Sequence, residues 1–166
     1  MGLPAEDIKE QGIILFGSKT IKEKIVEFLP KGSGYIVLTI DGYDGLEEGI
    51  IVFKGGNLYA AMYEYLKYGI TVLGDLALAR FFNAVSAKNG VIDVFNLSQD
   101  QVELAFKITN ERALLTKTTL KFGDLDRLIP KQYDESLAQN VLSKIAKKYE
   151  DKFDVLGKFN LTKLGE

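Results

Sequence analysis

Apolar and polar residues alternate along the chain in patterns that predict short strands and amphipathic helices. Tyr35–Ile40 is rich in β-branched side chains, and Ile50–Phe53 and Val91–Phe95 share this character. Such runs, bounded by turn-forming residues, are typical of strands. Asn57–Tyr63 follows Gly55-Gly56, a pair that suits a tight hairpin because glycine accepts positive φ. The pattern therefore predicts about four strands.

Three segments show the spacing of amphipathic helices: residues 20–29, 75–87 and 98–115. The first opens with the T-x-x-E spacing of a capping box, and the third opens with S-x-x-Q. Strands joined by short turns pair antiparallel. We therefore expect an α+β fold, with a small antiparallel sheet of about four strands and helices packed on one face.

The chain changes character after residue 115. GDLDRLIP predicts a short helical turn that ends at Pro130, and residues 134–153 predict a helix with one apolar stripe and charged, basic-leaning other faces. We therefore predict a core domain over residues 1–115 and a C-terminal helical extension over residues 116–166. The extension can dock on the sheet or on another molecule.

The chain contains no histidine and no cysteine. This excludes a Ser-His-Asp triad, a Cys-His pair and a histidine general base, and it removes the usual ligands of structural zinc. An enzyme with this composition would use carboxylates, Lys, Tyr or Ser, or a carboxylate-bound magnesium or calcium ion. We predict no catalytic residue and no cofactor, and the balance leans away from an enzyme.

The formal net charge is −2 and the pI is about 5.4. A general nucleic-acid binder carries a basic surplus to neutralise phosphates, so we do not expect nucleic acid as a partner. No apolar run approaches the ~20 residues of a membrane span, and the polar start MGLPAEDIKEQ lacks the apolar core of a secretory signal. We expect a cytoplasmic protein without a membrane partner. The scarcity of Met and the abundance of Ile, Lys and Glu favour a thermophile.

The stretch GIILFGSKT, residues 12–20, is close to a phosphate-binding loop. Such a loop needs lysine directly after its last glycine, but here Ser18 intervenes before Lys19. Four large apolar side chains lie between the glycines, and the polar stretch before Gly12 predicts no strand. We interpret the stretch as a buried segment that leads into a helix, with Ile14 and Phe16 in the core.

An acidic group, Asp41, Asp44, Glu47 and Glu48, lies in the expected connection between the first two strands. Such carboxylates can bind a hard cation, but the EF-hand spacing is not met. We interpret the connection as a solvated turn rich in Asp-Gly, and we predict no metal site.

Tyrosines gather in YAAMYEYLKYG. Alternation places Tyr59, Tyr63 and Tyr65 on one side of a strand. They can pack under the helices with their hydroxyls at the rim, or they can form an exposed patch that binds protein or, less favourably, stacks the bases of RNA. Our hypothesis for a partner-binding surface is the group Tyr63, Tyr65, Leu66 and Tyr68.

Residues 47–115 carry EEGIIVFKGGNLYAAMY, GDLAL and GVIDVFNLSQDQVELAF. This pattern resembles an uncharacterised archaeal family of unknown function. It is also loosely similar to PATAN-type regulatory domains, in which a glycine-led strand, a glycine turn, a second strand bearing Ala and G-[DE]-x-A-L follow one another. Here these are Gly49, Gly56, Ala60 or Ala61, and Gly74–Leu78, with the longer piece YEYLKYGITVL before Gly74.

The resemblance implies an interaction module without catalytic residues. We therefore expect a non-catalytic protein-interaction or regulatory module whose partner is another protein or a second copy. The alternatives are a small-ligand-binding protein or an enzyme that uses carboxylates and tyrosines, and, more weakly, RNA binding through the tyrosine-rich strand.

Overall fold

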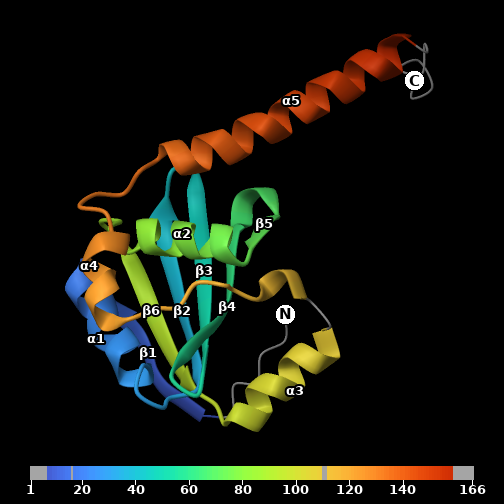
Figure 1. Cartoon of the computed structure of the whole chain (residues 1–166). Helices are drawn as coiled ribbons and strands as arrows, with labels where there is room; N and C mark the ends of the chain where they lie inside the picture. Colours follow the sequence, from blue (N-terminus) through green and yellow to red (C-terminus); the bar gives the residue numbers. More distant parts are fainter. Residues whose placement is uncertain (1–6, 16, 110–111, 159–166) are drawn as a thin grey trace. The chain divides into compact units, whose positions relative to one another are not determined.

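The computed structural model describes residues 7–15, 17–109 and 112–158. It has an α+β fold built on an antiparallel six-stranded sheet of order β1-β6-β2-β3-β4-β5 (Figure 1). The strands are β1 (Asp7–Ile14), β2 (Gly34–Gly42), β3 (Gly45–Lys54), β4 (Asn57–Tyr65), β5 (Ile70–Leu73) and β6 (Gly90–Asn96). The helices are α1 (Ser18–Phe28), α2 (Asp75–Ala84), α3 (Gln99–Thr109), α4 (Leu125–Leu128) and α5 (Ser136–Lys158), with short 3-10 turns η1 (Leu66–Tyr68), η2 (Arg112–Leu114) and η3 (Phe122–Asp124).

The expectation of about four strands was wrong, because both edge strands escaped the sequence pattern. β1 reads DIKEQGII, and its polar first half looked helical. β5 has only four residues and lies inside the longer piece YEYLKYGITVL, for which the pattern predicts no separate strand. β1 therefore lacks an apolar alternation, and β5 is apolar but too short to show a period.

Two tight hairpins form the centre of the sheet. β2 and β3 pair from Gly34↔Phe53 to Gly42↔Gly45, which leaves a two-residue turn at Tyr43-Asp44. The acidic connection is therefore mostly strand. Between β3 and β4, Gly55 and Gly56 both have positive φ, as expected, and a Cβ on Gly56 would lie 2.4 Å from the carbonyl oxygen of Leu29.

One face of the sheet is covered by α1 and α2. Ile21, Ile25 and Phe28 are buried on α1, as the amphipathic spacing of residues 20–29 predicts. The rings of Phe28 and Phe53 stack with centroids 5.2 Å apart. From α2, Phe81 and Phe82 pack into the same side of the fold and are almost fully buried, together with Leu78, Ile36, Leu38, Ile51 and Ile92.

Helices pack on both faces, although the sequence indicated only one. Val102, Ala105 and Phe106 of α3 join a second buried cluster with Tyr35, Ile50, Val52, Ala60, Leu97 and Leu114. Alternation places these strand residues opposite the side chains under α1 and α2. The central strands are apolar on both sides, so each face needs cover.

The N-termini of α1 and α3 test the two predicted capping boxes. The box at α3 is confirmed, because the amide of Ser98 donates to Gln101 Oε1 at 2.7 Å and the amide of Gln101 donates to Ser98 Oγ at 3.1 Å. The box at Thr20 is wrong: α1 begins at Ser18, after Gly17, and the N-cap forms no side-chain hydrogen bond.

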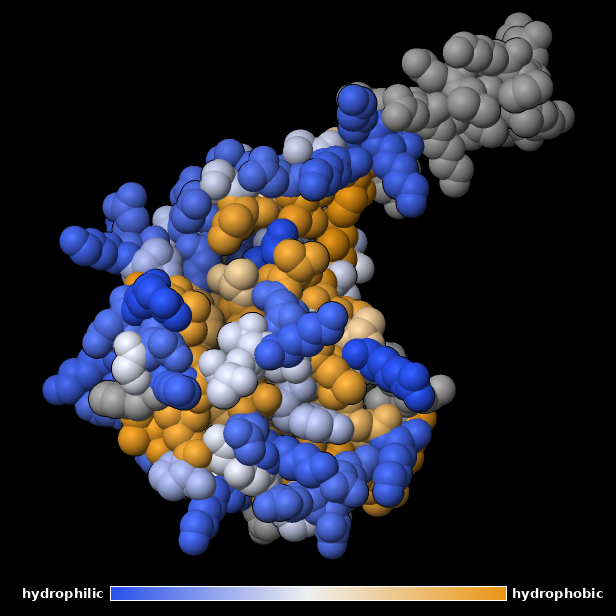
Figure 2. All heavy atoms as spheres, viewed as in Figure 1, coloured by the Kyte–Doolittle hydropathy of each residue, from blue (hydrophilic) through white to orange (hydrophobic). Residues whose placement is uncertain are grey.

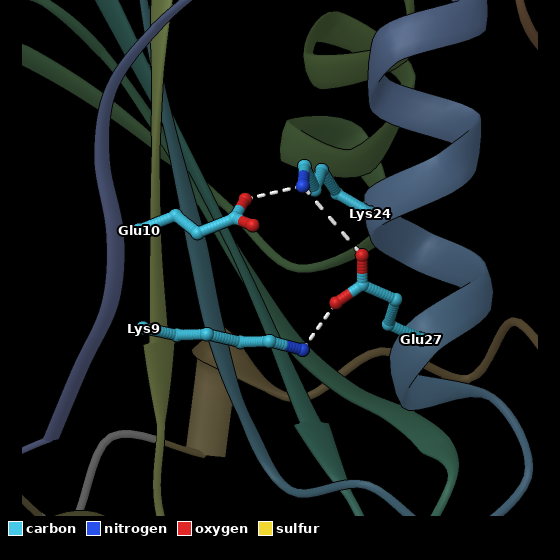
Figure 3. A network of polar contacts seen from close by, with 4 residues as sticks. All are labelled: Lys9, Glu10, Lys24 and Glu27. Atoms are coloured by element: carbon cyan, nitrogen blue, oxygen red, sulfur yellow. Dashed lines mark hydrogen bonds and ion pairs between the residues drawn. The ribbon is translucent and has the colours of Figure 1, made fainter.

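The edge strand β1 is fastened to α1 by a charged network (Figure 3). Lys24 forms ion pairs with Glu10 and with Glu27, and Glu27 also accepts from Lys9. The bond from Lys9 holds the pKa of Glu27 below its ordinary value, and the bond to Glu10 raises the pKa of Lys24. These ion pairs join β1 to α1 in addition to its pairing with β6.

The segment after η2 belongs to the sheet unit. The amide of Thr116 donates to the carbonyl of Tyr59 at 3.1 Å, and Leu120, Leu125 and Ile129 are buried. The structure divides into residues 1–133 and 134–166, whereas the predicted boundary was 115/116. The second unit contains α5, which matches the helix expected at 134–153.

Hydrophilic side chains cover much of the visible surface, with apolar groups showing between them (Figure 2). Within the described part of the chain, no helix is both long enough and apolar enough to cross a membrane.

Candidate functional site

Two neighbouring turns at one end of the sheet are joined through Asp44. Its Oδ1 accepts from Lys67 Nζ at 2.9 Å, and its Oδ2 accepts from the hydroxyl of Tyr68. Asp44 lies in the β2–β3 turn, whereas Lys67 and Tyr68 lie in η1 between β4 and β5. The bond from Tyr68, with help from Lys67, lowers the pKa of Asp44 and keeps it ionised. The carboxylate therefore fixes one turn against the other.

These two turns present large apolar side chains to solvent. Leu66 is 41 % exposed and Tyr68 is 44 % exposed, while Tyr43 and Leu46 of the β2–β3 hairpin are 42 % and 54 % exposed. Lys67 lies over the ring of Tyr68, with its Nζ 5.4 Å from the centroid. We call Tyr43, Leu46, Leu66 and Tyr68 the turn patch. Exposed apolar groups that lie together mark contact sites more often than scattered ones do.

Tyr63 and Tyr65 do not belong to this surface. They are 1 % and 4 % exposed, and their rings pack edge to face with centroids 5.5 Å apart. A buried side chain cannot contact a partner, so the expected surface at Tyr63, Tyr65, Leu66 and Tyr68 is reduced to Leu66 and Tyr68. The physical reason is that both tyrosines point toward the α2 side of β4, where Phe81 also packs.

Tyr59 is separated from the other two strand tyrosines. The β3–β4 register shifts between Val52 and Phe53, so that Phe53 pairs with Leu58. This irregularity turns Tyr59 toward the α3 side, where its ring meets Phe106 edge to face at 5.1 Å. The prediction that Tyr59 lies on the same side of the strand as Tyr63 and Tyr65 was therefore wrong, because the bulge interrupts the alternation.

Behind the turn patch lies a buried carboxylate, Glu47, which is 3 % exposed. Its Oε2 accepts from the hydroxyl of Tyr63 at 2.6 Å, and its Oε1 accepts from the hydroxyl of Tyr133 at 2.8 Å and the amide of Tyr43 at 3.1 Å. A Cβ on Gly42 would lie 2.3 Å from Oε1, so a larger residue at this position would displace the Glu47 side chain. Three donors satisfy a group that would be costly to bury alone.

The tyrosines around Glu47 hold their protons. Burial, reinforced by the Glu47 carboxylate, raises the pKa of Tyr63 far above its ordinary value, and the pKa of Tyr133 rises for the same reasons. Burial also raises the pKa of Tyr65, although its hydroxyl accepts from Arg80 Nε at 3.2 Å. Tyr63 and Tyr133 therefore act as donors to Glu47, whereas Tyr65 is a packing group that accepts from Arg80. Sequence reasoning missed Tyr133 because no local pattern marked it.

The acidic group does not converge. Asp41 and Glu48 point to the opposite side of the sheet from Glu47, because successive strand residues alternate. Among the described residues, no group of three or more acidic side chains has the geometry to hold a metal ion.

The stretch that resembles a phosphate-binding loop is split between two elements. Gly12 and Ile14 end β1, and Gly17 precedes α1. Ile14 is 59 % exposed, so its expected place in the core was wrong, and it is Leu15 that is buried. Phe16 lies outside the described residues. The absence of a preceding strand was also wrong, since β1 includes Gly12.

The turn patch adjoins the edge strand β5, which pairs with β4 from Met62↔Leu73 to Tyr65↔Ile70. β5 ends the sheet, so its outer side presents backbone groups that β4 does not use. The sequence ITVL carries no charge and no proline to oppose pairing with another strand. The site therefore combines a short open edge with a neighbouring apolar surface.

Comparisons with known proteins identify one family. No curated protein matches the chain, and no solved structure matches it. None of the comparisons shows the PATAN-type likeness, which stays a prediction. The family model covers β1 to α3, more than half of the chain, and includes the strands that carry the turn patch. The chain therefore belongs to the family described as "Uncharacterized protein conserved in archaea (DUF2226)", whose model matches residues 7–109.

Proposed function

We propose that the chain is a non-catalytic protein-interaction module that pairs with a second copy of itself through β5 and the turn patch. The observation that carries this proposal is the exposed pair Leu66 and Tyr68 beside an uncharged edge strand, with Tyr68 tied to Asp44. Neither feature alone would be sufficient, but together they provide backbone pairing and apolar contact on one surface.

The edge strand β5 determines how the two copies are oriented. Two copies of β5 can pair antiparallel about a two-fold axis, which makes the contact self-complementary. Four residues offer few hydrogen bonds, and each contributes only about 0.5–1.5 kcal/mol net. Most of the binding free energy must therefore come from apolar area, for which Leu66, Tyr68 and the exposed Leu76 after β5 are positioned.

Charge also favours a second copy. Asp44 and Lys67 lie within the same patch and carry opposite charges. Around a two-fold axis, Asp44 of one copy can approach Lys67 of the other without like-charge repulsion.

The chain has no cysteine, so a single introduced cysteine reports on this contact alone. Thr71 is exposed in the middle of β5. We expect Thr71→Cys, spin-labelled in the full chain, to give an intermolecular distance below about 25 Å, because neighbouring strands lie about 4.8 Å apart and the labels add their own length. The measured mass in solution should be that of a dimer.

The variant designed to disrupt the contact carries both Leu66→Glu and Thr71→Lys. The control variant is Leu104→Glu, at a residue of α3 that is also exposed. The first variant should be monomeric with an unchanged circular dichroism spectrum, whereas the control should remain dimeric. A parent chain that is monomeric at 100 µM, a labelled distance too long for adjacent strands, or a dimer that survives the disruption would each overturn the proposal.

A further inference from the structure

A separate pocket is lined by residues from the end of β3, from β4, from α3 and from η2 and the residue that follows it. Its volume is about 270 Å³. Ligand pockets for drug-sized molecules and cofactors begin at about 300 Å³, so this one suits a single large side chain or a molecule of similar size. The lining residues are Lys54, Tyr59, Glu103, Phe106, Lys107, Arg112 and Leu115.

The floor of the pocket is apolar and rigid. The rings of Tyr59 and Phe106 meet edge to face at an interplanar angle of 84°. Phe106 is 9 % exposed and belongs to the buried cluster, while Leu115 is 38 % exposed. The amide of Thr116 binds the carbonyl of Tyr59, which fixes the chain beside Leu115. A planar or branched apolar group therefore finds a preformed surface.

The rim of the pocket is cationic. Lys54 forms a 2.5 Å ion pair with Glu103 and lies 5.3 Å from the ring centroid of Tyr59, so it is fixed in place. Lys107 is 3.8 Å from the same carboxylate and its side chain is 76 % exposed. Arg112 has no acidic partner within the described residues. Among the described lining residues, Lys54, Lys107 and Arg112 are cationic and Glu103 is the one carboxylate, although the whole chain has a net charge of −2.

We infer that this pocket binds a carboxylate carried on a large apolar group, with the apolar part on Tyr59 and Phe106 and the carboxylate on Arg112 and Lys107. The planar guanidinium of Arg112 can hold both oxygens of a carboxylate. Lys107 can leave its long contact with Glu103 at little cost because that pair is exposed. Two sources share this chemistry: a free aromatic acid, and the C-terminus of a peptide that ends in a large apolar residue.

This inference does not rest on the dimer proposed above, since β5 and the turn patch contribute no residue to the pocket. The probes are N-acetyl-Gly-Phe with a free carboxylate, the same peptide as its carboxamide, and 3-phenylpropionate. Each is titrated into the full chain by ¹⁵N NMR. The free carboxylates should shift the amide signals of Tyr59, Phe106 and Leu115, and the carboxamide should bind at least ten-fold more weakly.

Arg112→Gln should weaken binding of the free carboxylate at least ten-fold, whereas Arg127→Gln, at an exposed arginine that pairs with Asp124, should not change it. Tyr59→Ala tests the apolar part in the same way, with its fold checked by circular dichroism. If N-acetyl-Gly-Phe binds and 3-phenylpropionate does not, the ligand is the C-terminus of a peptide. If 3-phenylpropionate binds equally well, the ligand is a free aromatic acid. No shift at millimolar probe, equal binding of the carboxamide, or unchanged binding by Arg112→Gln would overturn the inference.

Discussion

The hydroxyl of Tyr133 donates a 2.8 Å hydrogen bond to Oε1 of Glu47, which lies 86 positions earlier in the chain. Tyr133 is the last residue of the first unit, and Glu47 is buried in the central sheet. The bond therefore secures the point at which the chain leaves the sheet unit. Tyr63 holds the other oxygen of the same carboxylate.

We expect Tyr133→Phe to lower the free energy of unfolding by about 1–3 kcal/mol, because a buried carboxylate loses one of its donors. Urea denaturation measures the change, and hydrogen exchange should rise in residues 129–133. Tyr43→Phe is the matched control, since Tyr43 is exposed and binds Glu47 only through its backbone amide. Equal stability of Tyr133→Phe and the parent chain would show that water replaces the hydroxyl without loss.

Alkaline pH should destabilise the fold through the same group of tyrosines. The pKa of Tyr63 is raised above its ordinary value of 10.0, so its contribution is fully present below pH 10 and is lost as the pH rises further. Above pH 10 the unfolded chain releases the phenol proton while the folded chain retains it. Unfolding free energies measured from pH 8 to 11 should fall.

Lys24 adds to this decline, because its pKa is also raised in the folded state. Comparison with Tyr63→Phe separates the two, since that variant should be less stable at pH 8 but should lose less stability between pH 10 and 11. Parallel curves for the variant and the parent chain would mean that Tyr63 titrates alike in both states.

The central part of the fold could be predicted from the sequence because its signals are local. The Gly55-Gly56 turn, the Ser98–Gln101 capping box and the stripe of α1 each depend on residues a few positions apart. These features need no knowledge of the rest of the chain. The α+β class followed from them.

The remaining features depend on contacts between distant residues. β1 has no apolar pattern, pairs with β6 and forms ion pairs with α1, and the Glu47 group joins residues from positions 43 to 133. Nothing in DGYDGLEEG indicates that one of its four carboxylates is buried while Asp44 joins two turns. The bulge at Val52/Phe53 likewise has no sequence marker, so Tyr59 was assigned to the wrong side.

Adjacent residues of the glycine-flanked stretch should differ sharply in their effect on stability. Leu15 is 2 % exposed and its amide bonds to the carbonyl of Gly90, whereas Ile14 is 59 % exposed. We expect Leu15→Ala to cost about 2–5 kcal/mol and Ile14→Ala to cost less than about 1 kcal/mol. Thermal and urea unfolding measure both, and a reversed order would contradict the placement of β1.

The same stretch should not bind nucleotide. The side chain of Lys19 is 88 % exposed and pairs only at 3.9 Å with Glu23, one turn along α1. We expect ATP with magnesium to leave the melting temperature unchanged, and Lys19→Ala to behave like the parent chain. A rise of several degrees that Lys19→Ala abolishes would restore the phosphate-loop interpretation, because a ligand of the native state must stabilise it.

Asp75 should control how firmly the segment after η2 is held. Its Oδ1 accepts from Thr118 Oγ1 at 2.8 Å, and its carboxylate also accepts from the amides of Lys117 and Thr118. It stands in the first turn of α2, where a negative charge also favours the helix dipole. We expect Asp75→Asn to cost about 1 kcal/mol, a modest value because the site is exposed.

The matched control is Asp100→Asn, since Asp100 occupies the first turn of α3 and experiences the helix dipole. The bond from Thr118 lowers the pKa of Asp75, so its contribution is present above the ordinary value of 3.8 and is lost as the pH falls through the folded value. Asp75→Asn should therefore reduce the loss of unfolding free energy as the pH falls. Asp100→Asn should reduce this loss less. If both variants cost the same and change the acid limb equally, the dipole accounts for the whole effect and the bonds to residues 117 and 118 contribute nothing.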